Sequence, residues 1–164
     1  MLNLCMKTVY LVTFMFPLLF LHVLPAIADF DSGVLAYQNG QFSDALKEWT
    51  PIAEGGIPEV QFNLGQLYRD GKGTDQNYQI AVKWYKRAAN QGHSKAQYNL
   101  GIMYNNGYGV RKDQKKALIW YKLAAQGGNS SAQYNLGLMY EEGRGVGKNY
   151  VLAKKIVVSQ PGTE

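Results

Sequence analysis

The stretch Ala96-Gln97-Tyr98-Asn99-Leu100-Gly101 decides the fold, because the chain repeats it at a fixed spacing. Thirty-six residues later the chain reads Ala132-Gln133-Tyr134-Asn135-Leu136-Gly137, and 36 residues earlier it reads Val60-Gln61-Phe62-Asn63-Leu64-Gly65. A Gly-x-Gly follows each copy at the same distance: Gly71-Lys72-Gly73, Gly107-Tyr108-Gly109 and Gly143-Arg144-Gly145. Self-similarity at such a period is typical of repeat proteins, in which each repeat is one supersecondary unit. The sequence therefore predicts an array of stacked repeats.

Each period has the pattern of two helices. In the first copy, apolar residues recur at the spacing of one buried helical stripe, namely Val60, Leu64, Leu67 and Tyr68. Glycine adopts a left-handed conformation at the lowest cost, so Gly71 is expected to end this helix. A second helix is expected to begin near Asn77 or Tyr78 and to end at Gly92. The later residues lack strand-like alternation, so the predicted fold class is all-α, a solenoid of antiparallel helix pairs in 36-residue repeats.

Three equivalent glycines lie inside the expected first helices, where glycine costs about 0.8–1.0 kcal/mol relative to alanine. Close packing between helices would offset this cost. We expect each glycine to face a small residue of the second helix: Gly65 facing Ala81, Gly101 facing Ala117 and Gly137 facing Ala153. The larger Tyr68 and Trp84 are expected to fill the space beside the first of these contacts.

The first 28 residues have the features of a secretory signal peptide. Lys7 precedes an apolar run from Val9 to Leu24, and Ala26-Ile27-Ala28 supplies a small-x-small ending. We place cleavage after Ala28 and expect an exported protein, periplasmic or secreted. The alternative is an uncleaved leader that anchors the chain in a membrane. It is less favoured because the run is about 16 residues long, whereas a spanning helix needs about 20.

The rest of the chain divides at the repeat boundaries. Residues 29–58 hold a shorter helix-turn-helix unit, because Gly33 to Ala45 spans 12 residues where Gly65 to Ala81 spans 16. Such an atypical terminal unit predicts an N-terminal cap. The three repeats are assigned to 59–94, 95–130 and 131–158, of which the third is truncated. Residues 159–164 are expected to form a disordered tail.

Composition excludes several classes of site. The chain has one cysteine, Cys5, and two histidines, His22 and His93, and the first two of these three lie in the expected leader. A Cys- or His-based metal site, a disulfide framework and a cysteine nucleophile are therefore not expected, and neither is any cofactor. The chain has 17 Lys plus Arg against 12 Asp plus Glu, and the basic residues occur singly or in short pairs along it. A nucleic-acid partner is accordingly not predicted.

Three other motifs also fail to predict catalysis. Gly107-Tyr108-Gly109 follows a helix and lacks the Gly-Lys-Ser/Thr signature, so it is not expected to bind phosphate. Glu141 and Glu142 are adjacent on a helix and do not face each other as an acid/base pair would. His93 follows Gly92 at a helix end, where a cation is mildly favoured, and no nucleophile is expected beside it. We therefore predict that the protein is not an enzyme.

One full repeat carries a recognisable order of residues: Ala96-Gln97-Tyr98-Asn99-Leu100-Gly101, Tyr104, Gly107-Tyr108-Gly109-Val110, Asp113, Ala117, Trp120-Tyr121, Ala124-Ala125 and Gly128. With this order the chain from about Asp31 to Val158 resembles the Sel-one-like repeat proteins, relatives of the tetratricopeptide repeat proteins. Thr74 departs from the pattern, since valine stands at the equivalent positions 110 and 146, and the third repeat lacks the Trp-Tyr-x-x-Ala-Ala ending. The resemblance implies a right-handed superhelix that acts as a scaffold for protein contacts, often at bacterial envelopes.

Stacked helix pairs form an extended concave surface lined by their first helices. A stripe distinct from the buried one is expected on that face, and the tetratricopeptide groove positions select the same residues by similarity. The residues expected to bind a partner are Phe62, Gln66, Arg69, Asp70, Lys95, Tyr98, Ile102, Asn105, Asn106, Tyr134, Leu138, Glu141 and Glu142, flanked by Glu59 and Ser131. Phe62, Tyr98 and Tyr134 would form an aromatic ladder, with Asn105 and Asn106 bonding a peptide backbone. The alternative is that these rings pack between repeats and the polar members are merely solvated.

Three functional hypotheses remain. The favoured one is a non-enzymatic scaffold or adaptor of the bacterial envelope that binds a protein or peptide through the concave face, with no stable membrane insertion after leader cleavage. The alternative is a structural role at the cell wall, in which exposed aromatics contact peptidoglycan or another carbohydrate. An envelope hydrolase is least favoured, because the chain has no serine followed three residues later by lysine.

Overall fold

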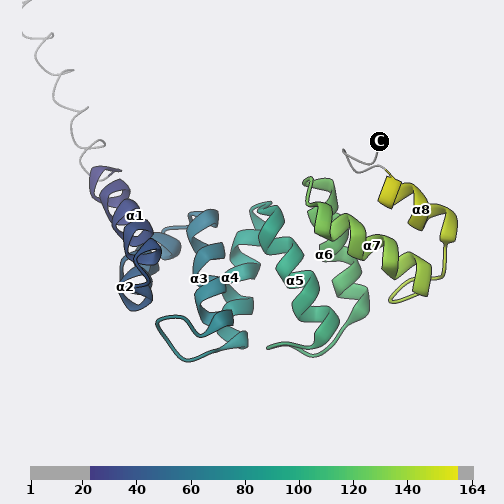
Figure 1. The fold of residues 1–164 in the computed structure, drawn as a ribbon, viewed down its shortest axis with the longest axis horizontal. Coiled ribbons are helices and arrows are strands. Elements are labelled where there is room, and N and C mark those ends of the chain that lie inside the picture. The colour runs from purple at the N-terminus through teal and green to yellow at the C-terminus, as the bar shows by residue number, and fades with distance from the viewer. Residues whose placement is uncertain (1–22, 159–164) are drawn as a thin grey trace, which may run out of the picture.

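The computed structural model describes residues 23–158, which form a curved row of eight helices (Figure 1). Their bounds are α1 Val23–Gln38, α2 Phe42–Glu54, α3 Pro58–Asp70, α4 Tyr78–Asn90, α5 Ser94–Asn106, α6 Gln114–Gln126, α7 Ser130–Glu142 and α8 Tyr150–Val158. Each helix packs against the helices before and after it in the chain. The predicted all-α solenoid of antiparallel helix pairs is therefore confirmed.

The expected leader lies mostly outside the described residues, as does the expected tail 159–164. Residues 23–28, the last part of that expected leader, form the first turns of α1. Within residues 23–158 the structure has no helix that is both long enough and apolar enough to cross a bilayer.

The glycine after each first helix ends that helix as predicted. Gly71, Gly107 and Gly143 have φ values of 66°, 81° and 77°, and the amide of each donates to the carbonyl four residues earlier. The second helix α4 begins at Tyr78, where the side chain of Asn77 accepts a hydrogen bond of 3.0 Å from the Ile80 amide. An N-cap of this kind satisfies one of the four free amides at a helix start.

The second glycine of each Gly-x-Gly serves contact between repeats. Gly73 lies against the backbone of Phe42 and Ser43, at the start of α2, so a Cβ at this position would overlap that backbone. The equivalent glycines make the same contact one and two repeats later: Gly109 with Tyr78 and Gln79 at the start of α4, and Gly145 with Gln114 and Lys115 at the start of α6. Each loop is thereby seated on the second helix of the preceding unit.

The glutamine of the repeated stretch also joins neighbouring units. Gln61 is buried, and its side-chain nitrogen donates to the Ala53 carbonyl at the end of α2 over 2.9 Å. Gln97 makes the equivalent bond to Ala89 over 3.1 Å. A buried amide that bonds the last turn of the preceding helix satisfies both groups and fixes the offset between units.

The glycines inside the first helices face aromatic rings, which corrects one sequence-based expectation. A Cβ at Gly65 would meet the ring of Tyr85, and a Cβ at Gly101 would meet the ring of Tyr121. The expected partners, Ala81 and Ala117, are fully buried nearby, but the ring occupies the space above the glycine. In the N-terminal unit Gly33 faces Trp49 in the same way. Of the adjacent rings of Trp84 and Tyr85, the Tyr85 ring is the buried one, while Trp84 is only half-buried.

His93 is a second correction, because it begins a helix and does not end one. It is the N-cap of α5: its Nδ1 accepts a hydrogen bond of 3.1 Å from the Ala96 amide. Its Nε2 lies 2.8 Å from Glu59 Oε2, and its ring stacks on Phe62 with centroids 4.7 Å apart. Asn129 caps α7 at the equivalent position. His93 is therefore a structural residue at the junction of two repeats.

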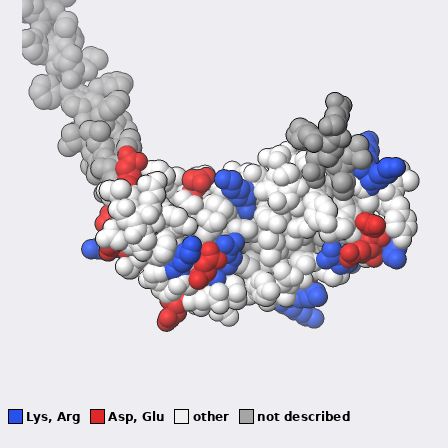
Figure 2. All heavy atoms as spheres, in the orientation of Figure 1, with Lys and Arg blue, Asp and Glu red and all other residues white. Residues whose placement is uncertain are grey.

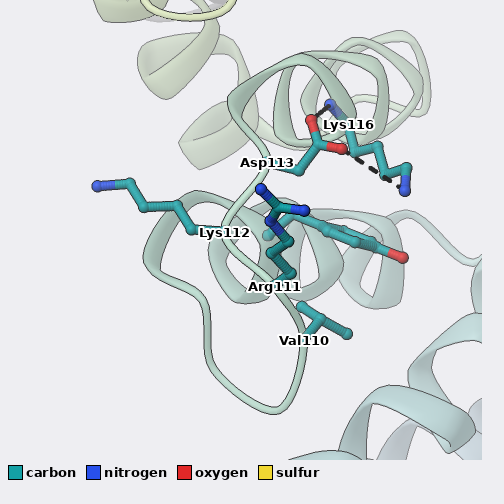
Figure 3. Close-up of a pocket in the computed structure, with 6 residues that line it drawn as sticks. Val110, Arg111, Lys112, Asp113 and Lys116 are labelled. Atoms are coloured by element: carbon teal, nitrogen blue, oxygen red, sulfur yellow. Dashed lines mark hydrogen bonds and ion pairs between the residues drawn. The ribbon is translucent and has the colours of Figure 1, made fainter.

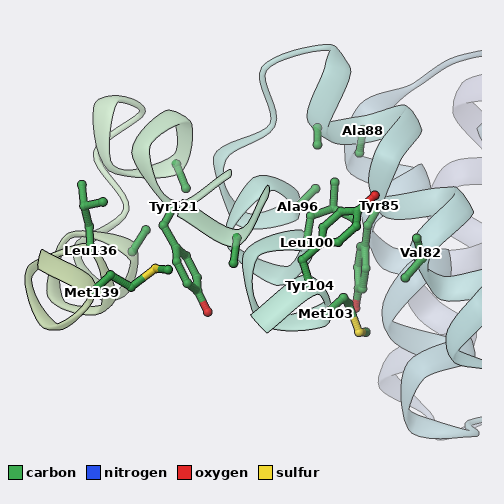
Figure 4. Packing of buried hydrophobic residues seen from close by; sticks show 14 of the residues in the cluster. Val82, Tyr85, Ala88, Ala96, Leu100, Met103, Tyr104, Tyr121, Leu136 and Met139 are labelled. Atoms are coloured by element: carbon green, nitrogen blue, oxygen red, sulfur yellow. The ribbon is translucent and has the colours of Figure 1, made fainter. Parts of the chain in front are cut away.

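The buried residues form two clusters that meet at the first repeat. One joins α1, α2 and the α2-facing side of α3, with Trp49, Leu64 and Leu67 among its members. The other extends from Phe62 to α8 and contains the tyrosines that face the helical glycines (Figure 4). Each repeat is thus stabilised by its neighbours, as in other solenoids.

Candidate functional site

Part of the predicted stripe lies at three hollows, which residues of the first helices line together with residues of α4 and α8. The first, which we call the C-terminal groove, has a volume of about 380 Å³ and is lined by Tyr134, Gly137, Leu138, Glu141, Tyr150, Ala153 and Lys154. A second hollow of about 470 Å³ is lined by Tyr98, Ser130, Ser131, Tyr134 and Asn135. The two share Tyr134, so a single surface runs from α5 across α7 to α8. It contains four of the predicted residues: Tyr98, Tyr134, Leu138 and Glu141.

The third hollow lies between the C-terminal ends of α3 and α5 and has a volume of about 160 Å³. Three predicted residues, Arg69, Asp70 and Ile102, line it together with Gln76, Tyr78, Asn99, Met103 and Tyr108. Arg69 and Asp70 are already paired, since Arg69 Nε lies 2.6 Å from Asp70 Oδ1. The Gln76 side chain donates to the Arg69 carbonyl over 2.8 Å. This hollow is small, and Arg69, Asp70 and Gln76 are engaged with one another.

The aromatic ladder is not a row of exposed rings. Phe62 is only 6% exposed, because Tyr85 and His93 cover it. Tyr98 is half-buried beside Tyr121, whereas Tyr134 is 53% exposed. Phe62 thus packs at the junction of two repeats. Exposure rises along the array because each ring is covered from the C-terminal side, and Tyr134 belongs to the last repeat that the structure describes.

The remaining polar members of the stripe do not gather at a hollow. Asn105 and Asn106 bond to each other, with Asn105 Nδ2 donating to Asn106 Oδ1 over 3.0 Å, and Arg144 Nη1 donates to Asn105 Oδ1 over 3.3 Å. Arg144 also pairs with Glu142, with 2.6 Å between Nε and Oε2. Within the described chain, Gln66, Lys95, Asn105, Asn106 and Glu142 line none of these three hollows.

A basic hollow lies elsewhere, at the start of α6, and sequence reasoning did not identify it. Its volume is about 530 Å³, and its lining is Tyr104, Val110, Arg111, Lys112, Asp113 and Lys116 (Figure 3). The Asp113 carboxylate caps α6 by accepting from the Lys116 amide over 3.0 Å, and this bond lowers the pKa of Asp113. Its other oxygen lies 3.5 Å from Lys116 Nζ. Asp113, the single acidic residue that lines this hollow, is thus already bonded to the first turn of α6.

The signal that would have found this basic hollow is charge counted by segment. Residues 80–126 hold nine Lys or Arg and one acidic residue, Asp113, whereas residues 29–79 hold eight Asp or Glu and three Lys or Arg. Over the whole chain the charges of the two segments largely cancel, so the net charge is only mildly positive. In Figure 2 the middle of the molecule, near α5, is mainly uncharged. Charged side chains lie toward both ends, along the lower edge and in small patches at the upper edge.

Burial raises the pKa of two tyrosines, the ones whose rings pack against Gly65 and Gly101. Tyr85 and Tyr121 are almost fully buried, and loss of hydration of the charged form is the main cause for both. The Tyr85 hydroxyl lies near the Asn99 amide but makes no hydrogen bond of good geometry with any described residue. These phenols stay neutral and act as packing groups. No cluster of three His, Cys, Asp or Glu able to hold a metal occurs among the described residues.

Comparison with known proteins agrees with this architecture. The Sel1 repeat family model matches residues 58–93, 94–129 and 130–155. A solved structure of a protective antigen present in uropathogenic Escherichia coli strains, which displays an SLR fold, is similar with a TM-score of 0.76 and 37% identity over 80% of this chain and 29% of that chain. A Sel1 repeat protein from Oxalobacter formigenes gives a TM-score of 0.75 and 32% identity over 81% of this chain and 56% of that chain.

One curated relative matches over a shorter stretch. The chitin synthase regulator SKT5 of Saccharomyces cerevisiae is 44% identical over 52 residues, which is 32% of this chain and 7% of that protein. The chain spans less than two thirds of the length of each of these proteins. Sel1 repeats generally form non-catalytic scaffolds for protein interaction. Because the family model matches most of the described helices, the chain belongs to the Sel1 repeat family.

Proposed function

We propose that this protein is a non-enzymatic adaptor that binds a peptide or protein through the concave face formed by α3, α5 and α7. The observation that carries the proposal is the exposed ring of Tyr134, which is shared by two adjoining hollows. Single exposed apolar residues are ordinary, whereas a ring that joins two hollows provides a continuous contact surface. Binding is therefore expected to centre on α7.

The chemistry of this surface suits a peptide with an apolar anchor. Tyr134, Leu138 and Tyr150 supply apolar area, and Ser131, Asn135 and Glu141 supply hydrogen-bonding groups at the margin. Aromatic side chains carry much of the energy of protein interfaces, because they bury a large area at low entropic cost. The neighbouring polar groups would fix the orientation of the bound backbone.

Site-specific photocrosslinking tests this proposal. A photoreactive phenylalanine analogue at position 134 of the full chain is expected to crosslink a protein partner in an envelope extract. Affinity capture of the same protein by the chain without the analogue is expected to be lost in Tyr134→Ala. Ile119→Ala is the matched control, because Ile119 is a similarly exposed apolar residue on α6 that lines none of the three hollows. Circular dichroism checks that the variants keep their helicity. Equal capture by all forms would contradict the proposal.

We further propose that the protein is exported to the bacterial envelope. The support is the leader-like sequence of the first 28 residues together with the bacterial origin of the two similar structures. Expression of the full chain followed by fractionation should yield a periplasmic or secreted form that begins at Asp29 in mass spectrometry. Recovery of the intact chain in the membrane fraction would favour the uncleaved anchor.

A cell-wall role is the second candidate, favoured by the exposed rings of Tyr134 and Tyr150. Such rings can stack on sugar faces as well as on peptides. Sedimentation of the purified protein with peptidoglycan, in the absence of other proteins, distinguishes the two candidates. Binding that Tyr134→Ala abolishes would favour the carbohydrate role, and no binding would leave the adaptor role.

A further inference from the structure

Three successive units share one contact between a helical glycine and an aromatic ring. Gly33 of α1 faces Trp49 of α2, Gly65 of α3 faces Tyr85 of α4, and Gly101 of α5 faces Tyr121 of α6. All three rings are almost fully buried. We call the space over each glycine the aromatic seat. In these three units a ring from the second helix of the same unit fills it.

The third repeat keeps the glycine but lacks the ring. The residue 36 positions after Tyr121 is Val157, which has three side-chain carbons in place of a phenol. Gly137, at the equivalent of Gly101, is one of the residues that line the C-terminal groove. Where the two preceding repeats bury a tyrosine, this repeat has a hollow of about 380 Å³.

The rings on either side of this groove are also uncovered. Tyr150 begins α8 and is 62% exposed. Its equivalents are covered by the next unit: Phe42 lies under Lys72, with 5.1 Å between Nζ and the ring centroid, and Tyr78 stacks on Tyr108 with centroids 5.1 Å apart. Tyr134 is exposed for the same reason. Within the described chain no further repeat covers Tyr134 or Tyr150.

We propose that the C-terminal groove is a binding seat for an aromatic side chain, Tyr or Trp, of a peptide from another protein. The incoming ring lies on Gly137, in the place that Tyr85 and Tyr121 occupy in the preceding repeats, and it contacts Tyr134 and Tyr150. The chain itself forms this contact between a glycine and a ring three times, at Gly33, Gly65 and Gly101. This inference rests on the proposed function and names the side-chain class that it recognises.

The size and polar groups of the groove fit that occupant. Its volume is at the lower end of the range of about 300–1,000 Å³ that is usual for ligand pockets, which suits one side chain better than an extended ligand. Glu141 and Lys154 line the groove beside its apolar residues. The Glu141 carboxylate is an acceptor for an indole N–H or a phenol O–H, which aliphatic side chains lack.

The test uses the full chain and two small probes, N-acetyl-tryptophanamide and N-acetyl-leucinamide. Titration followed by amide NMR is expected to shift the Gly137 resonance saturably with the aromatic probe and to leave Gly101 unchanged. The leucine probe is expected to bind at least about tenfold more weakly. No saturable shift at Gly137, or equal binding of both probes, overturns the proposal.

Val157→Tyr is the decisive variant, because it restores a tyrosine 36 residues after Tyr121. It is expected to raise the melting temperature and to abolish the shift caused by the aromatic probe. Gly137→Ala places a methyl group on the seat and serves as a second variant if Val157→Tyr does not fold. Gly147→Ala, where a Cβ meets nothing within 4 Å, is the matched control that should bind as the parent does.

Unchanged probe binding by a folded Val157→Tyr chain overturns the aromatic seat. It leaves the adaptor proposal standing, provided that photocrosslinking at position 134 still captures a protein. If the chain binds the aromatic probe but photocrosslinking at position 134 captures no protein, the aromatic seat stands and the adaptor proposal fails. The two proposals can therefore fail separately.

Discussion

At the scale of single residues, the absence of a side chain is the feature that organises each helix pair. Gly101 lies in the interior of α5, where glycine is costly, and the ring of Tyr121 occupies the space that its side chain would fill. The aromatic contact buries far more apolar area than alanine could offer in place of the glycine. Gly33 and Gly65 likewise leave space for an aromatic ring at the cost of a glycine inside a helix.

Gly101→Leu should therefore unfold the protein at a lower temperature. The added side chain must displace the Tyr121 ring, and overpacking of this kind costs about 1–3 kcal/mol or more. Thermal melts followed by circular dichroism measure the effect. Gly147→Ala is the control, since it adds a Cβ in open space. An unchanged midpoint for Gly101→Leu would show that the ring contact contributes nothing to stability.

The two buried tyrosines predict loss of stability at high pH. Burial raises the pKa of Tyr85 and Tyr121 above their ordinary value of 10.0, so the unfolded chain ionises first as the pH rises. Their contribution is complete below about pH 10 and is lost above it, by at most about 2.7 kcal/mol per pH unit for the pair. Urea unfolding between pH 8 and 12 measures this dependence. The double variant Tyr85→Phe/Tyr121→Phe should show a shallower decline, and an identical decline would assign it to other groups.

The sequence predicted which residues are special better than it predicted their partners. Gly101 and His93 both stood out, yet their contacts with Tyr121 and Phe62 depend on how helices lie in space. Phe62 and Tyr134 occupy equivalent positions, but one is buried and the other exposed. Periodicity treats such positions as identical, whereas burial depends on whether a neighbouring unit packs over the ring.

At the scale of elements, the Gly-x-Gly loop combines two functions. Its first glycine ends a helix in a left-handed conformation, and this local requirement is why the ends of α3, α5 and α7 were predictable from the sequence. Its second glycine, such as Gly109, touches the start of the preceding second helix. That contact joins residues about 30 positions apart, so no local pattern indicated it.

Gly109→Ala should cost more than Gly92→Ala, although both glycines have positive φ values of 66° and 86°. A Cβ at Gly92 meets nothing within 4 Å, so only the left-handed conformation is penalised, by about 1–2 kcal/mol. At Gly109 the Cβ also overlaps the backbone of Tyr78, which adds about 1–3 kcal/mol. Chemical denaturation gives both free energies of unfolding. Equal losses would mean that the loop separates from α4 at little cost.

At the scale of the whole molecule, the two ends of the described array are more exposed than its interior. Leu35 of α1 is 59% exposed, whereas Leu67, at the equivalent position of α3, is fully buried. At the other end Val151 of α8 is 83% exposed. Each interior helix packs against two neighbours, while α1 and α8 each pack mainly against one. Stability in such an array is the sum of nearest-neighbour terms, so it should decline toward both ends.

Native-state hydrogen exchange is expected to show this decline directly. Backbone amides of α4, α5 and α6 should exchange most slowly, because they open only when contacts on both sides are lost. Amides of α8 should exchange at least about tenfold faster, since its opening breaks mainly contacts with α7. Binding of an aromatic probe in the C-terminal groove should slow exchange in α8 before it affects α4. Uniform protection from α2 to α8 would instead mean that the repeats unfold as one cooperative unit, and the nearest-neighbour account would then be wrong.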